Sequence, residues 1–284
     1  MHRTRNTAKT TFEHFLAGAI AIYPQMRALA LKGIDAARNH RYEEIEIGKH
    51  IRLAVEETQK WQKGGNINLG TVFLLSPLCA SAGISIATSG VKAKKLRENM
   101  EFVFKNTTPQ DAIELYNTIT VAKPGGLGHS SKLDVTDPKS KSEILEKQIT
   151  LLDVFRISAE WDDISREWIT NFEITFDLGY PTFSRILKEI GDVNVATVNT
   201  YLTILSSLQD TLIKRKAGQR AAESVRKKAE MILKSGGLLS EKGTDLIWRL
   251  DEQLSKKNGL LNPGTTADLT AASIMVALLE RPRI

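Results

Sequence analysis

Hydrophobic residues recur along most of this chain at spacings of three and four, the period of an α-helix with one buried face. Beyond the N-terminal segment, such patterns run through residues 44–60, 142–159, 165–176, 182–189, 195–208, 211–234 and 244–256. No segment shows the clean alternation of a half-exposed β-strand. The pattern predicts an all-α fold. The 284 residues, 42% of them hydrophobic, suffice for one buried core, so we expect a single-domain multi-helix bundle over residues 1–284.

Two segments have a composition that imitates membrane segments. Residues 64–91 contain no charged residue, but Pro77, Gly83 and four serines lower their hydropathy below that of a typical spanning helix. We interpret this segment as a central helix that other helices bury on all sides. Near the N-terminus, basic residues precede the apolar stretch 15–23 as in a secretory signal. The apolar residues there trace one helical face instead, so we expect no membrane partner.

Local signals mark several helix starts. Thr108-Pro109-Gln110-Asp111 combines a cap, a first-turn proline and an acidic third position, which predicts a helix through Ile119. Asp162-Asp163 is interpreted as a cap with first-turn acids rather than as a metal site. The five histidines show no metal-ligand spacing, so the metal ligands stay open. The one cysteine, Cys79, lies in an apolar setting typical of a small core residue and points to a reducing, cytoplasmic compartment.

The positive charge is concentrated in one segment. The formal net charge is +6, and residues 214–228 hold seven Lys or Arg against one acid, Glu223. This run is a solvated face, a binding site for a triphosphate, or a surface for nucleic-acid phosphates. Residues 211–234 contain no aromatic residue, which argues against recognition of single strands by base stacking.

A turn, a helix start and a carboxylate lie close together near the C-terminus, in the segment Asn262–Leu269. Here Pro263-Gly264 breaks the preceding structure, Thr265 or Thr266 can cap a helix over residues 266–279, and Asp268 falls in its first turn. Amides and hydroxyls at such a helix start suit a phosphate. The alternative is a capping box that only starts the helix.

Four segments, in order, carry a family resemblance. They are residues 64–70, with Asn66 and Asn68 in a glycine loop; residues 179–181; residues 209–213 with Arg215, Lys216 and Gly218 after them; and residues 262–269. This order resembles the triphosphoribosyl-dephospho-CoA synthase family. The likeness to its archaeal-type branch adds Lys123-Pro-Gly-Gly-Leu-Gly ahead of Asp134-Val135.

The resemblance implies a transferase that moves the triphosphoribosyl unit of ATP to a ribose hydroxyl of dephospho-CoA and releases adenine. Positive charge on the sugar then requires a carboxylate, and the acceptor hydroxyl requires a base. The family motifs place Asp268 and Asp210 in these catalytic roles without deciding between them. They also imply ATP as a substrate, with Mg²⁺, and the following phosphate or nucleotide contacts: Asn66, Asn68, Lys123, Arg215, Lys216, Gly264, Thr265 and Thr266.

Two departures from the family pattern affect the expected substrate and the start of the chain. Asn68-Leu69 stands where the lyase-associated enzymes carry a His-Lys pair, a possible acid/base group and a possible phosphate cation, so the acceptor stays open between dephospho-CoA and a related coenzyme precursor. The family's opening Lys-Pro-Gly motif is expected upstream of Met1. A second class of function stays open: a helical nucleic-acid-binding or scaffold protein that keeps the fold without the chemistry. The sequence leaves the oligomeric state undetermined.

Overall fold

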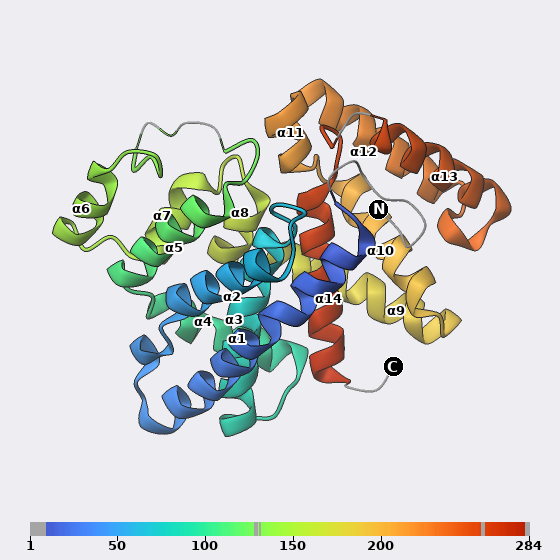
Figure 1. The fold of residues 1–284 in the computed structure, drawn as a ribbon. Helices are drawn as coiled ribbons and strands as arrows, with labels where there is room; N and C mark the ends of the chain where they lie inside the picture. The colour runs from blue at the N-terminus through green and yellow to red at the C-terminus, as the bar shows by residue number, and fades with distance from the viewer. Residues whose placement is uncertain (1–9, 128–129, 131, 257–258, 282–284) are drawn as a thin grey trace. The chain divides into compact units, whose positions relative to one another are not determined.

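The computed structural model describes residues 10–127, 130, 132–256 and 259–281 (Figure 1). All regular elements in these ranges are helices, which confirms the predicted all-α class. The described residues divide into two compact units, an N-terminal unit that starts at Thr10 and ends at Phe172 and a C-terminal unit that starts at Glu173. Each unit is described by itself, and the single domain over residues 1–284 stays a prediction. The N-terminal residues 1–9 and Gly128, the last residue of the Lys123 motif, lie outside the described ranges.

The N-terminal unit is built from eight α-helices and one 3₁₀ turn within its described residues. In chain order they are α1 (Phe12–Asn39), η1 (Tyr42–Ile45), α2 (Ile47–Trp61), α3 (Leu69–Thr88), α4 (Ala93–Lys105), α5 (Pro109–Ala122), α6 (Lys139–Glu146), α7 (Leu151–Ser158) and α8 (Asp163–Ile169).

Helix α3 is the predicted central apolar helix. By length and composition it could cross a membrane, but 72% of its most apolar window is buried inside the protein, as expected of a core helix. Two glycines let α1 approach it closely. A Cβ atom at Gly33 would lie 2.0 Å from the Ala80 carbonyl oxygen, and one at Gly83 would lie 1.9 Å from that of Ala30. Cys79 is buried on α3, and desolvation raises the pKa of its thiol to about 12.

Hydrogen bonds fix the relative directions of α1, α2 and α5. Helix α2 runs antiparallel to α1, since Gln25 pairs with His50 at 2.7 Å and Lys32 with Glu46 at 2.9 Å. Helix α5 runs parallel to α2, because the Gly48 amide donates to Asp111 at 2.9 Å and Arg52, one turn further along α2, pairs with Glu114, one turn further along α5. The start of α1, the end of α2 and the end of α5 therefore meet at one end of the unit, together with the loop of residues 62–68 that leads into α3. We call this the glycine-loop end.

The C-terminal unit packs its helices around α10. Its described elements are η2 (a π-helical turn, Thr175–Gly179), α9 (Tyr180–Ile190), α10 (Val193–Ser207), α11 (Thr211–Ala217), α12 (Gln219–Lys234), η3 (Gly237–Leu239), α13 (Glu241–Ser255) and α14 (Gly264–Glu280). Leu202 and Leu205 of α10 are buried against Val225 and Ala229 of α12. Helices α9 and α14 contribute a second small core with Phe183 and Ile186.

Three predicted helices differ from the structure at turns that the hydrophobic period does not reveal. The segment 211–234 breaks at Gly218, whose φ of 86° and ψ of 165° suit only glycine. The segment 142–159 breaks at Gln148, and Thr150 then caps α7 by accepting from the Asp153 amide. The segment 165–176 ends at Ile169, followed by residues with positive φ. Helix α4 was not predicted.

The capping predictions in the N-terminal unit are confirmed. Thr108 and Asp111 form a capping box at the start of α5, with Pro109 as the first helical residue. Asp162 caps α8 by accepting from the Ser165 amide at 3.3 Å. These caps were predictable because each joins residues that lie within one helical turn of each other.

Candidate functional site

The carboxylate of Asp210 joins the starts of two helices in the C-terminal unit. Its Oδ1 atom accepts from the Ile213 amide at 3.0 Å and so caps α11. Its Oδ2 atom accepts from both the amide and the hydroxyl of Thr266 on α14, each at 2.8 Å. The side chain is 2% exposed. Burial raises the pKa of Asp210, and the hydrogen bonds from Thr266 and Ile213 act in the opposite direction.

Two further contacts hold the same helix starts together. The Thr211 hydroxyl donates to the Thr265 hydroxyl oxygen at 3.2 Å. A Cβ atom at Gly264 would lie 2.6 Å from Cδ2 of Leu212, so the glycine permits the close approach of α11 and α14. The family motifs at residues 209–213 and 262–269 thus form one hydrogen-bonded structure, which the sequence alone did not reveal.

The start of α14 corrects the expected cap. The helix begins at Gly264 rather than at residue 266, and no side-chain hydrogen bond is made by the capping residue, Pro263. Thr265 and Thr266 lie inside the first turn, and Asp268 is the fifth helical residue, outside that turn. The anion at this helix start is the carboxylate of Asp210. A phosphate could use the donors of Thr266 only by displacing that carboxylate.

Charged side chains follow both joined helix starts. Asp268 lies four residues after Gly264 on α14, and Arg215 lies four residues after Thr211 on α11, each about 6 Å along its helix. Asp268, Arg215 and Lys216 are all partly exposed. The structure therefore brings the predicted carboxylate and two predicted phosphate cations into the same part of the C-terminal unit.

Four of the seven basic residues of the segment 214–228 lie on the next helix, α12, and three of these four make local pairs. Arg226 on α12 binds both oxygens of Glu223 at 2.8 Å and donates to the Ser206 carbonyl at 2.9 Å. The hydrogen bond from Arg226 is the main cause that lowers the pKa of Glu223 to about 2. Lys228 donates to Gln253 at 2.6 Å. The prediction of one basic helix over residues 211–234 is therefore wrong, because the structure has two helices there. Part of the positive charge of this segment is used in contacts within the unit.

The glycine loop of the N-terminal unit is held in a compact form. The side-chain Oδ1 atom of Asn66 accepts from the Leu69 backbone amide at 3.2 Å, which satisfies a backbone donor at the start of α3. The side-chain Nδ2 atom of Asn68 donates to the Gly18 carbonyl at 3.4 Å and to the Thr58 hydroxyl oxygen at 3.3 Å. The side chain of Gln62 donates to the Gly65 carbonyl at 2.9 Å and so closes the loop. Asn66 is exposed, whereas Asn68 is half-buried.

Lys123 lies at the glycine-loop end as well, because α5 runs parallel to α2. It is the exposed residue that ends α5, with φ 44° and ψ 56° in the left-handed region. Its amide donates to the Ile119 carbonyl at 2.9 Å. A residue other than glycine pays roughly 1–2 kcal/mol for this conformation. Asn66, Asn68 and Lys123 thus share one end of the N-terminal unit.

Trp61 is a candidate that the sequence analysis missed. It is the last residue of α2, directly before Gln62 and the glycine loop, and it is 56% exposed. An exposed indole is a stacking platform for a nucleobase. The sequence signal that could have identified Trp61 was its position at the end of an amphipathic helix, immediately ahead of a loop that contains glycine and asparagine.

No group of three or more metal-ligating side chains occurs among the described residues. Asp210 does not suit a metal ion because its oxygens already accept three hydrogen bonds. Mg²⁺ commonly takes one or two carboxylates together with substrate phosphates, so Asp268 is the predicted site residue that fits such a role.

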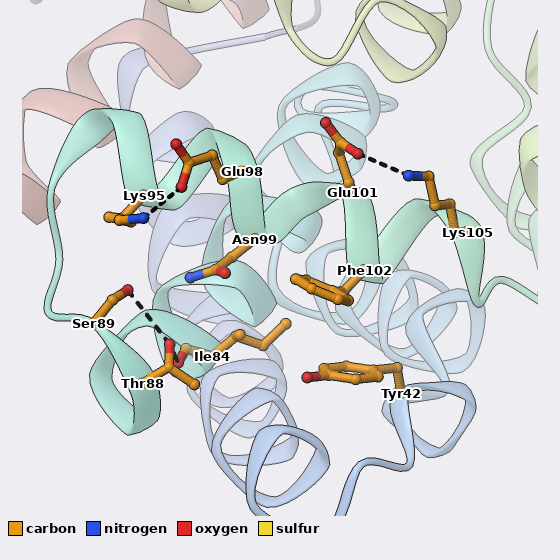
Figure 2. Close-up of a pocket in the computed structure, with 10 residues that line it drawn as sticks. All are labelled: Tyr42, Ile84, Thr88, Ser89, Lys95, Glu98, Asn99, Glu101, Phe102 and Lys105. Carbon is orange, nitrogen blue, oxygen red and sulfur yellow. Dashed lines mark hydrogen bonds and ion pairs between the residues drawn. The ribbon is translucent and has the colours of Figure 1, made fainter.

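A surface pocket of about 580 Å³ lies at the opposite end of the N-terminal unit, where α3 ends (Figure 2). Tyr42 and Phe102 stack there with ring centroids 4.9 Å apart. The lysines of the pocket pair with acids on the same helix, Lys95 with Glu98 at 2.7 Å and Lys105 with Glu101 at 2.8 Å. None of the predicted site residues lines it.

A chain whose described regular elements are all helices, with cations, amides and carboxylates at helix ends, fits the class of α-helical enzymes that bind phosphorylated substrates. The chain belongs to the ATP:dephospho-CoA triphosphoribosyl transferase family, whose family model matches residues 1–283. This match confirms the resemblance seen in the sequence. It favours the transferase interpretation over a nucleic-acid-binding or scaffold protein.

Individual relatives agree with the family. The 2-(5''-triphosphoribosyl)-3'-dephosphocoenzyme-A synthase of Klebsiella pneumoniae is 31% identical over 93 residues, which are 33% of this chain and 30% of that protein. The match therefore spans less than a third of that relative's length. A Vibrio cholerae protein named as a probable enzyme of the same kind is 22% identical over 92% of this chain and 75% of its own length.

A solved structure shares the fold. The crystal structure of an Archaeoglobus fulgidus protein, assigned as a triphosphoribosyl-dephospho-CoA synthase, superposes with a TM-score of 0.69 at 26% identity. The superposition covers 95% of this chain and 100% of the other. The archaeal-type motif at Lys123 is consistent with this likeness.

Proposed function

We propose that this protein transfers the triphosphoribosyl unit of ATP to a hydroxyl of dephospho-CoA or a related coenzyme precursor, with release of adenine. The family match over residues 1–283 carries the proposal. In this reaction the bond between the anomeric carbon and adenine breaks, and a bond from that carbon to the acceptor oxygen forms. The proton of the acceptor hydroxyl leaves with the adenine, so the reaction is balanced without an oxidant or reductant.

Within the C-terminal unit, we assign the electrostatic role to Asp268. The sugar carbon becomes positively charged as adenine leaves, and a nearby carboxylate stabilises this charge. Asp268 is partly exposed and can meet a substrate, whereas Asp210 is buried and accepts hydrogen bonds from Ile213 and Thr266. Asp210 is therefore proposed as a positioning residue that fixes the start of α14. Arg215 and Lys216 are proposed as phosphate contacts.

Within the N-terminal unit, the glycine-loop end is proposed to bind a nucleotide. Lys123 supplies a cation for phosphate, while Asn66 and Asn68 supply amide groups for a sugar or base edge. ATP would enter with Mg²⁺ on its phosphates, and the ion would neutralise part of the triphosphate charge. The Asn68-Leu69 pair lacks the histidine and lysine of the lyase-associated enzymes, so we propose an acceptor other than dephospho-CoA as the alternative substrate. The enzyme is proposed to act in the cytoplasm.

The direct test is incubation of the purified protein with adenine-labelled ATP, with and without dephospho-CoA. We expect free adenine to form only when an acceptor is present. Release of ADP or AMP without adenine, whichever acceptor is offered, would contradict the proposal. Binding of random duplex DNA at physiological salt tests the other class, and we expect little of it because Arg226 and Lys228 are engaged within the protein.

Trp61 tests the nucleotide site at the glycine-loop end. We expect Trp61→Ala to weaken ATP binding about tenfold, since stacking contributes roughly 1–3 kcal/mol per base, and Trp61→Phe to retain most of the affinity. The affinity for inorganic triphosphate, which has no base, should not change. Titration calorimetry measures both ligands. Trp248→Ala is the matched control, because Trp248 is 53% exposed on α13. Equal ATP affinity in Trp61→Ala and the parent would remove Trp61 from the site.

Lys123 allows function and stability to be separated. We expect Lys123→Gly to leave the melting temperature unchanged or slightly raised, because glycine relieves a left-handed conformation that costs roughly 1–2 kcal/mol. Loss of a charge-assisted phosphate contact should nevertheless weaken ATP binding by about 10-fold or more. Gln148→Gly is the control, since Gln148 is exposed with φ 52° and lies outside the proposed site. Parental ATP affinity in Lys123→Gly would show that Lys123 only ends a helix.

A further inference from the structure

Helix α1 carries a stripe of exposed apolar side chains. Leu16, Ile20 and Tyr23 are 49%, 60% and 65% exposed, and their spacing of four and three places them on one face. The opposite face holds buried Ile22 and Leu29. Large apolar side chains that gather on one exposed helix face are typical of a protein contact surface.

Opposite charges flank this stripe symmetrically. Glu13 and Arg27 are both exposed, and each lies seven residues from Ile20. Seven residues make about two turns, so both charges lie on the same face as Ile20, roughly 10 Å to either side of it. An arrangement of acid, apolar centre and base along one helix is complementary to its own antiparallel copy.

We propose that this face of α1 binds α1 of a second copy of the chain in a two-fold antiparallel pair, with Ile20 on the symmetry axis. Glu13 of each copy then lies opposite Arg27 of the other, and the same surface is used by both copies, as a two-fold interface requires. Leu16 and Tyr23 pack beside the axis. A shallow crossing of about 20° keeps both charge pairs within reach of their long side chains.

The charges also select this register. With the axis placed between Ile20 and Tyr23 instead, Arg27 would lie against Leu16 of the second copy and lose its acidic partner. Such a mismatch disfavours the shifted pairing. One helix pair buries less than the ~1,600 Å² of a standard interface, so the dimer is weak, with a Kd in the micromolar range.

Sedimentation velocity of the full chain from about 1 to 300 µM brackets this range. The parent shifts from monomer to dimer with concentration. Ile20→Asp places two carboxylates on the axis and stays monomeric, with an unchanged melting temperature because the side chain is exposed in the protomer. Glu13→Arg and Arg27→Glu each raise the Kd several-fold, and the double variant restores it. Trp248→Ala, the exposed control on α13, dimerises as the parent does.

Three results would overturn the proposal. The first is that the parent stays monomeric up to 300 µM. The second is that Ile20→Asp dimerises like the parent, which would mean that another surface is used. The third is that the double charge variant binds no better than the single variants. Binding of monomeric parent to phosphatidylserine vesicles, abolished by Ile20→Asp, would assign the stripe to a lipid surface and also overturn it. None of these measurements depends on the transferase reaction.

Discussion

Replacement of Asp268 by asparagine is expected to lower the rate of adenine release by roughly 10²-fold or more, the scale of losing a catalytic electrostatic group. The substitution keeps the size of the side chain and removes its charge. Asp268 is the fifth residue of α14, outside the first turn, so it does not cap the helix. We expect the free energy of unfolding to change by less than about 1 kcal/mol. Turnover and thermal melting should be measured on the same preparation.

A matched control is available in the same unit. Asp245 is the fifth residue of α13, as Asp268 is of α14, and it is exposed. Asp245→Asn should retain the parental rate, because it removes the same charge at the same helical position from a helix that carries none of the proposed site residues. If Asp268→Asn melts with the parent and also releases adenine at the parental rate, Asp268 is a surface acid and the proposed chemistry loses its carboxylate.

Replacement of Asp210 by asparagine is expected to destabilise the protein by about 2 kcal/mol or more. An asparagine has one acceptor oxygen, whereas Asp210 accepts at both oxygens from Ile213 and Thr266. One N–H or O–H donor would face the new amide nitrogen and stay unsatisfied in a buried site, which costs roughly 1–3 kcal/mol per group. The start of α14 would be held less firmly, and the position of Asp268 on that helix would be less well fixed. Chemical denaturation measures the loss directly.

Asp111 is the control for Asp210. Its buried carboxylate likewise serves two helix starts, since it accepts from the Gly48 amide of α2 and from Thr108 at its own helix. Asp111→Asn should therefore cost similar stability but retain the turnover of the folded fraction, because it lies outside the proposed site. Full loss of turnover in Asp210→Asn, with the parental free energy of unfolding, would instead make Asp210 a group that acts in the reaction.

Local sequence signals correctly predicted the structural features that depend on residues close together in the chain. The all-α class followed from the hydrophobic period, and the central helix from the uncharged run around α3. The caps at Thr108 and Asp162 followed from side chains that reach amides within one turn. Gly218 was a visible break signal, but the apolar period continues on both sides of it, and we therefore predicted one helix where the structure has two.

The sequence by itself determined most of the helices, the apolar core helix and the family motifs, since each depends on residues close together in the chain. Only the tertiary structure decided how these motifs are used. Asp210 reaches Thr266 across 56 positions, and Asp111 reaches Gly48 across 63, because helix packing brings distant helix starts together. The parallel course of α2 and α5 likewise placed Lys123 with the glycine loop. Whether Trp61 or Ile20 is exposed depends on which face each helix packs against its neighbours, and no local pattern fixes that choice.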